Sequence, residues 1–230
     1  MARAMTRPDH GYLPSGAPYR PPCGALSVIH RDDALLLVDK PAGLLSVPGK
    51  AEGLADCLEA RVRAEYPEAL LLHRLDMDTS GLMVFARSRL AQRHVAWQFE
   101  RRQLKKTYIA RVLGMPAASE GRIDLPLTCD WPRRPLQKVC HDLGKASVTD
   151  WRITGHDDGN ARLEIAPLTG RSHQIRVHLK EIGHPILGDR FYAPAEALVA
   201  APRLMLHAET LTLRHPDGGA WVTYRAHAPF

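Results

Sequence analysis

Two apolar runs joined by a short polar loop, residues 70–72 and 81–86, constrain the fold of this chain more than any other feature. Their length and composition predict two buried strands. The loop between them carries Arg74, Asp76, Asp78, Thr79 and Ser80, and it closes at Gly81. A carboxylate placed between two buried strands loses part of its water, which raises its pKa unless a cation lies close. A site that needs an ionised, poorly hydrated, nucleophilic carboxylate has this construction.

The composition bounds the class of protein. A chain of 230 residues with 45% hydrophobic and 24% charged residues is typical of a soluble globular protein with one full core. The longest apolar runs fall well short of the roughly 20 residues that span a bilayer, and no apolar stretch follows the N-terminal arginines as in a signal peptide. The four cysteines are scattered without a CxxC pair, which favours reduced thiols in a cytoplasm over zinc or disulfides.

The positive charge is concentrated in one segment. The chain has a net charge of +6 and a pI near 9.3, which alone could serve only solubility. Residues 87–111 contain Glu100 as their only acid, against Arg87, Arg89, Arg93, Arg101, Arg102, Lys105, Lys106 and Arg111. A solvated helix face normally mixes charges of both signs, so this bias favours contact with nucleic acid.

The rest of the chain predicts one α+β domain with a mainly antiparallel sheet. Residues 1–25 are rich in proline and glycine and predict a disordered or surface-wrapping tail, followed by a single domain over residues 26–230. Strand patterns outnumber helix patterns and come as hairpins, for example around residues 157–160 and 217–219. Ser88 and Ser172 are candidate N-caps of two helices, and most basic residues after Ser88 face outward.

Five blocks of sequence carry a resemblance to a known family. Residues 73–76 (HRLD) with residues 79–81 (TSG) resemble the signature of RluA-type RNA pseudouridine synthases. The match continues, in the family's order, through residues 106–112 (KTYIARV), 170–178 (GRSHQIRVH), 184–189 (HPILGD) and 204–208 (LMLHA). It runs from about Leu26 to the C-terminus. Residues 130–132 and 137–139 further resemble the short member of the family that acts on both 23S rRNA and transfer RNA.

The resemblance implies a fold, a reaction and a set of site residues. It implies the pseudouridine synthase fold with flanking helices and a central catalytic cleft, and no N-terminal RNA-binding domain of the S4 type, for which residues 1–25 are too short. The reaction breaks the N1–C1′ bond of uridine and joins C5 to C1′, with no redox change and no cofactor. Asp76 matches the family's essential aspartate. Whether it adds to the uracil, attacks C1′ or removes a proton at C2′ stays open at this stage.

The other site residues follow from the same motifs. Arg176 is expected to pair with Asp76, with Arg171 as the alternative, since an ionised carboxylate in a cleft needs a fixed cation. Tyr108 and Leu206 are expected on either side of the target uracil. Arg74 either fills the space that the flipped base vacates or binds a phosphate. Contacts with RNA are expected from Thr79, Arg101, Arg102, Lys105, Lys106 and Arg171.

Other interpretations fit the sequence less well. Asp76 with Asp78 resembles the paired carboxylates of glycosidases, but residues two apart in a turn rarely straddle one bond. The histidines lack the spacing of a metal site, so we expect no metal and interpret them as structural hydrogen-bonding groups. A non-catalytic RNA-binding module and a metal-dependent nuclease remain alternatives. The expected partners are 23S rRNA and tRNA, and the expected state is a cytoplasmic monomer.

Overall fold

The computed structural model describes residues 18–51 and 53–230, so most of the predicted tail lies outside the described residues. The strands are β1 (Ser27–Arg31), β2 (Leu35–Lys40), β3 (Leu70–Leu71), β4 (Ser80–Ala86), β5 (Lys105–Val112), β6 (Glu120–Asp124), β7 (Leu127–Cys129), β8 (Gln137–Val139), β9 (Val148–Asp157), β10 (Asn160–Pro167), β11 (Leu206–Arg214) and β12 (Trp221–Arg225). The helices are α1 (Leu58–Glu65), α2 (Arg89–Glu100), α3 (Gln174–Glu181) and α4 (Ala195–Val199), with a 3-10 turn at Trp131–Arg133.

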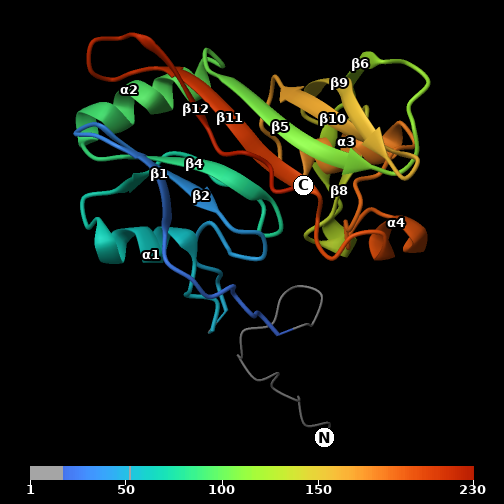
Figure 1. The fold of residues 1–230 in the computed structure, drawn as a ribbon, viewed down its shortest axis with the longest axis horizontal. Helices are drawn as coiled ribbons and strands as arrows, with labels where there is room; N and C mark the ends of the chain where they lie inside the picture. Colours follow the sequence, from blue (N-terminus) through green and yellow to red (C-terminus); the bar gives the residue numbers. More distant parts are fainter. Residues whose placement is uncertain (1–17, 52) are drawn as a thin grey trace, which may run out of the picture.

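One large sheet organises the molecule. Its strand order is β1-β2-β4-β11-β5-β10-β9-β6, and β12 pairs with β11 while β3 pairs with β4. Within the described residues, every pairing in this sheet is antiparallel except that of β4 with β11. In Figure 1 the long strands β11 and β5 cross the middle and join a left half around β2 and β4 to a right half around β9 and β10. The prediction of an α+β fold with a mainly antiparallel sheet is confirmed.

The prediction of two buried strands holds for residues 81–86, whereas residues 70–72 give only the two-residue strand β3 at the edge of β4 and are half-buried. Strands β2 and β4 are buried because helices cover both faces of the left half. Leu35 and Leu37 of β2 belong to a cluster with Val95 of α2, whereas Leu36 and Val38 belong to one with Leu58 and Val62 of α1. Successive side chains of a strand point to opposite faces, so a strand between two helices must be apolar throughout. All seven residues of β4 are buried for the same reason. On the right half, Leu163 and Ile165 of β10 share a cluster with Ile175 and Leu179 of α3.

The parallel contact between β4 and β11 fixes where the polar loop lies. Ser80 is paired with His207, and Gly81 with Ala208. Residues 72–79 lead directly into Ser80, so the loop lies where the two halves of the sheet meet. Gly81 has φ +113°, and a Cβ on it would lie 2.3 Å from the carbonyl oxygen of Ala208. Only glycine allows this close approach of the two strands.

Of the two predicted helix caps, Ser88 is confirmed and Ser172 is wrong. Ser88 caps α2, because its Oγ accepts a hydrogen bond from the amide of Ala91 at 3.1 Å. The prediction that Ser172 caps α3 is wrong: the cap position is His173, in the left-handed conformation with φ +53°. The Gln174 side chain stabilises this turn instead, because its Oε1 accepts a hydrogen bond from the amide of Arg171 at 3.1 Å.

Residues 18–25 lie against α1 and the loop before it. The hydroxyl of Tyr19 donates to the carbonyl of Asp56 at 2.9 Å and accepts from the amide of Leu45 at 3.0 Å. The guanidinium of Arg61 donates to the carbonyl of Pro22 at 2.9 Å. This part of the predicted tail therefore wraps along the surface of the domain.

Gly81→Ala tests the close approach of β4 and β11. The new methyl group meets the Ala208 backbone and the left-handed φ is strained, so we expect a loss of stability of at least about 1–3 kcal/mol. Gly155→Ala is the matched control, because a Cβ there has nothing within 4 Å. Urea unfolding of both variants measures the difference. Equal midpoints for the two variants would contradict this account of the junction.

Candidate active site

The backbone of the polar loop is fixed on both sides of Asp76. Before it, the Ser46 hydroxyl donates to the carbonyl of Leu75 at 2.7 Å and accepts from its amide at 3.1 Å. After it, the carbonyl of Met77 accepts from the amide of Gly43 at 2.9 Å. These contacts come from the loop that follows β2, so the position of Asp76 is set by residues about 30 positions away in the sequence.

A buried lysine adds a further restraint that the sequence analysis missed. Lys40, with 0% of its surface exposed, donates from Nζ to the carbonyls of Pro41, Leu44 and Met77 at 2.8–2.9 Å. An ammonium group has three N–H donors, so all of them are used. Burial lowers the pKa of Lys40 to about 7, against the opposing effect of Asp78 and Asp76. The available signal was the sequence Lys-Pro-Ala-Gly at residues 40–43, which has the composition of a turn.

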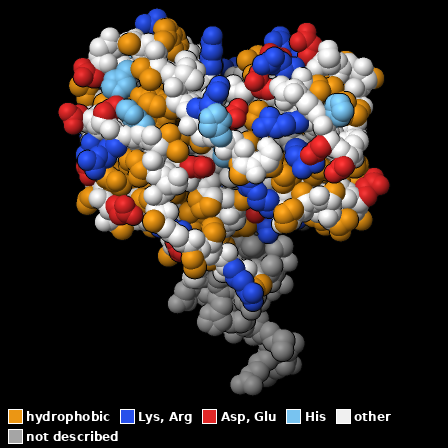
Figure 2. Space-filling model, in the orientation of Figure 1, with side chains coloured by type: hydrophobic (Ala, Val, Ile, Leu, Met, Phe, Trp, Pro, Cys, Tyr) orange, Lys and Arg blue, Asp and Glu red, His pale blue; other side chains and the backbone are white. Residues whose placement is uncertain are grey.

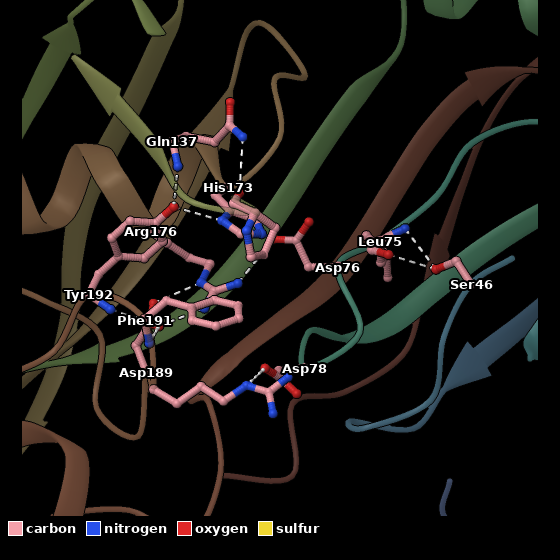
Figure 3. A network of polar contacts seen from close by, with 12 residues as sticks. Ser46, Leu75, Asp76, Asp78, Gln137, His173, Arg176, Asp189, Phe191 and Tyr192 are labelled. Atoms are coloured by element: carbon pink, nitrogen blue, oxygen red, sulfur yellow. Dashed lines mark hydrogen bonds and ion pairs between the residues drawn. The ribbon is translucent and has the colours of Figure 1, made fainter. Parts of the chain in front are cut away.

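Asp76 lies at the centre of the site, with its side chain 30% exposed (Figure 3). The Arg176 Nη1 lies 3.5 Å from Asp76 Oδ2, and the His173 Nε2 lies 4.0 Å from the same oxygen. The structure thus brings Arg176 to the carboxylate as predicted, whereas Arg171 is not an ion-pair partner of Asp76 in the described residues. Asp76 is partly open to the cleft, so a substrate has access to it.

Arg176 has a second and closer carboxylate partner. Its Nε and Nη2 donate to Asp189 at 2.7 and 2.6 Å, and both side chains are only 1% exposed. Burial disfavours the charge of Arg176, but the contact with Asp189 outweighs it and raises the pKa of the guanidinium. Asp189 was not predicted as a site residue, although residues 184–189 are one of the blocks that carry the family resemblance. Arg176 therefore remains charged and fixed in place beside Asp76.

A cleft of about 240 Å³ opens beside Asp76. It collects most of the predicted site residues: Arg74, Asp76, Thr79, Lys106, Tyr108, Arg171, Arg176 and Leu206. Burial, with the charge of Asp76 as a second cause, raises the pKa of Tyr108, so its hydroxyl stays protonated. The cleft is lined by an aromatic side chain (Tyr108) and an aliphatic one (Leu206) next to the carboxylate of Asp76.

The cleft continues into a basic groove of about 780 Å³. Both are lined by Phe99, Lys106 and residues 169–171, and the groove adds Arg102 and Lys105. Arg101 lines neither the cleft nor the groove. It is the C-cap residue of α2, and its guanidinium lies over the ring of Trp97, 5.9 Å from the centroid. Figure 2 shows further Lys and Arg side chains along the middle of one face, with acidic and hydrophobic side chains around them.

The alternative carboxylate pair is not supported by the geometry. Asp78 forms an ion pair with Arg190 at 2.9 Å, away from Asp76 (Figure 3). Over residues 18–51 and 53–230, no three His, Cys, Asp or Glu side chains are grouped so as to hold a metal ion. No helix in the described ranges is long and apolar enough to cross a membrane.

Comparison with known proteins identifies the class. The profile of the family described as RNA pseudouridylate synthase matches residues 34–181, and the chain belongs to this family. It is an RNA pseudouridine synthase, an isomerase that acts on RNA. The alternative of a non-catalytic RNA-binding module is not favoured.

Particular relatives are close in sequence and in length. The chain is 50% identical over 214 residues to "Dual-specificity RNA pseudouridine synthase RluA" of Escherichia coli (strain K12), covering 92% of this chain and 98% of that protein. It is 44% identical over 220 residues to the protein of the same name from Pasteurella multocida, covering 95% and 98%. Among solved structures, "Human RNA Pseudouridylate Synthase Domain Containing 1" superimposes with a TM-score of 0.76 at 28% identity, covering 92% of this chain and 87% of that chain.

His73, at the edge of the cleft, predicts a pH dependence of stability. Its Nε2 accepts from the amide of Val84 at 3.2 Å, as expected for a structural histidine, and burial lowers its pKa to about 3. The unfolded chain binds this proton below its ordinary pKa of about 6.5, whereas the folded protein does not until about pH 3. Stability therefore falls as the pH drops from 6.5 towards 3, by up to about 1.4 kcal/mol per pH unit from this group.

His73→Gln removes this titration and keeps an acceptor for Val84. We expect a shallower decline of stability between pH 6.5 and pH 4 than in the wild type, measured by urea unfolding at each pH. Parallel curves for the two proteins would show that His73 does not contribute.

Proposed function

We propose that this enzyme converts specific uridines to pseudouridine in 23S rRNA and in a tRNA anticodon stem-loop, acting as a monomer in the cytoplasm. The observation that carries the proposal is the Asp76 carboxylate, open to the cleft and held 3.5 Å from the buried guanidinium of Arg176. Two RNA classes are supported by the dual-specificity name of relatives at 50% identity and by residues 130–132 and 137–139. The single domain over residues 26–230 supplies both the chemistry and the recognition.

Asp76 is assigned as the catalytic residue. The reaction breaks N1–C1′ and forms C5–C1′, after which the proton on C5 leaves and N1 takes one up, so the formula is unchanged. A carboxylate in this cleft reaches either the ribose or the uracil of an everted nucleoside. Arg176 places a fixed positive charge 3.5 Å from that carboxylate. The reaction changes no oxidation state and needs no external energy source.

Tyr108 and Leu206 are assigned to the target base. Both line the cleft with Asp76, one aromatic and one aliphatic, so a uracil ring between them packs on two apolar surfaces. The base reaches this place only after it leaves its stack, which costs a few kcal/mol. Arg74 is exposed at the mouth of the cleft, where its guanidinium either takes the vacated space or binds a phosphate.

The basic groove is assigned to the RNA backbone that flanks the target. Arg102, Lys105, Lys106 and Arg171 line it, and Thr79 lies in the cleft from which it starts. Phosphate contacts fix the register of the RNA and carry no sequence information. Arg101 contributes from outside the groove as part of the surrounding positive field.

Asp76→Asn tests the catalytic assignment and the substrates together. We expect loss of pseudouridine formation in 23S rRNA and tRNA, with binding of both RNAs changed by less than about threefold, because the substitution removes one charge and keeps the shape. Pseudouridines are mapped by base-specific chemistry in RNA treated with wild type or variant. Asp150→Asn, which alters an ion pair with Arg122 on β6 and β9, is the control with full activity.

Each result has a defined meaning. Retained activity in the Asn variant would reject the assignment of Asp76. Equal loss of binding and activity would make Asp76 an RNA-binding residue. Modification of one RNA class alone would reject dual specificity.

Removal of groove cations should lower the salt dependence of RNA binding. Lys105→Ala and Arg102→Ala are each expected to reduce the slope of log K against log salt by about 0.7–0.9, the contribution of one phosphate contact. Arg63→Ala on α1 removes an exposed cation outside the groove and should leave the slope unchanged. Titrations of a stem-loop RNA at several salt concentrations measure the slopes. Unchanged slopes in the groove variants would place the RNA on another face.

A further inference from the structure

The two oxygens of the Asp76 carboxylate have different surroundings. Arg176 Nη1 and His173 Nε2 both approach Oδ2, at 3.5 and 4.0 Å. From the described residues, Oδ1 receives neither a hydrogen bond nor an ion pair. In Figure 3 one oxygen of Asp76 faces His173 and Arg176, and the other points away from them. The site therefore distinguishes the two oxygens before any substrate enters.

A hydrogen-bond chain determines which nitrogen of His173 carries its proton. The backbone amide of Gln137 donates to the hydroxyl oxygen of Tyr192 at 2.9 Å, and that hydroxyl lies 2.7 Å from His173 Nδ1. The phenol proton needs an acceptor, and Nδ1 is the group in line with it. If Tyr192 donates to Nδ1, the neutral imidazole carries its hydrogen on Nε2, which faces Asp76.

His173 has an unusual backbone conformation, and its ring is held by a neighbouring aromatic side chain. Its φ of +53° is a left-handed conformation that few residues other than glycine adopt, and such conformations gather at functional sites. The imidazole stacks on the ring of Phe191, with centroids 5.7 Å apart and planes at 21°. Burial lowers the pKa of His173, with Arg176 acting in the same direction and Asp76 against it. The ring is therefore neutral at pH 7.

We propose that His173 is a positioning residue for the reaction, whose Nε2–H holds Oδ2 of Asp76 together with Arg176 and leaves Oδ1 as the oxygen that meets the nucleoside. This inference rests on the proposed catalytic role of Asp76. The separation of 4.0 Å exceeds a hydrogen bond by about 1 Å, and it closes when the flipped nucleoside displaces water from the cleft. Tyr192 and Gln137 then act through His173, which links the start of β8 to the carboxylate.

Three variants separate a donor from a space-filling ring. His173→Phe keeps a ring on Phe191 but has no N–H, His173→Gln places an amide donor near the position of Nε2, and Tyr192→Phe removes only the hydroxyl. We expect single-turnover rates at saturating RNA to fall about 100-fold, tenfold and tenfold in that order, as for loss or weakening of one preorganised donor. RNA affinity should stay within about twofold. Tyr19→Phe is the control, since its hydroxyl also bonds one backbone amide and one acceptor, beside α1.

The rate is measured as release of tritium from C5 of uridine in a labelled stem-loop transcript, because that hydrogen is lost on conversion. NMR of the ¹⁵N-histidine-labelled protein gives the tautomer without any turnover. We expect His173 protonated at Nε2 in the wild type and a mixture of tautomers in Tyr192→Phe.

The outcomes are distinct. If His173→Phe turns over within about twofold of the wild type, or if wild-type His173 is protonated at Nδ1, the inference is overturned. If His173→Phe does not fold, Tyr192→Phe decides: a rate equal to that of Tyr19→Phe overturns the inference, and a slow rate with unchanged affinity supports it. A wild-type protein that releases no tritium would instead overturn the proposed function.

Discussion

The arrangement of the site depends on one buried guanidinium shared between two carboxylates. Arg176 gives its Nε and Nη2 to Asp189 and presents Nη1 to Asp76, and its charge also lies 5.1 Å from the ring of Phe191. A buried charge is tolerated only when it is paired and hydrogen-bonded, and removing one member of such a pair costs about 3–5 kcal/mol. Asp189 additionally accepts from the amide of Phe191, so the same carboxylate shapes the loop that carries Phe191 and Tyr192. The packing around Arg176, the conformation of the loop that carries Phe191 and the charge beside Asp76 thus all depend on the contact between Arg176 and Asp189.

The sheet supplies the second constraint, because it brings Asp76 and Arg176 together from opposite halves of the molecule. The polar loop enters β4, whereas Arg176 lies on α3, which packs against the right half. In the described part of the chain, the short parallel pairing of β4 with β11 is the only strand pairing that joins the left half of the sheet to the central strands, and it requires glycine at position 81. A shift of this junction would change the distance between carboxylate and guanidinium. The distance between Asp76 and Arg176 is therefore fixed by the close backbone contact between β4 and β11.

Much of this could be predicted from sequence, because local patterns carry it. The apolar run at residues 81–86 predicted the buried strand β4, Ser88 predicted the start of α2, and the motifs predicted that Arg176 lies beside Asp76. The residues that were missed act through contacts between positions far apart in the sequence. Lys40 meets Met77 across 37 positions, and Tyr192 meets His173 across 19. Ser172 was wrongly expected to cap α3. The sequence does not show that the Gln174 side chain accepts the hydrogen bond from the Arg171 amide in this turn. Arg101 was expected to contact RNA, and its place at the C-cap of α2, with the guanidinium over Trp97, puts it outside the groove.

Under the proposed function, the division between groove and cleft separates affinity from selectivity. The groove cations would then attract any RNA, since phosphates are alike in every sequence. Selectivity would come from the cleft, because a uridine has to leave its stack to enter the space between Tyr108, Leu206 and Asp76. On this proposal, binding of the flanking RNA backbone supplies the free energy that brings the base to the reactive geometry. The fixed backbone around Asp76 serves the same end, because groups that are already in place need no reorganisation when the nucleoside arrives.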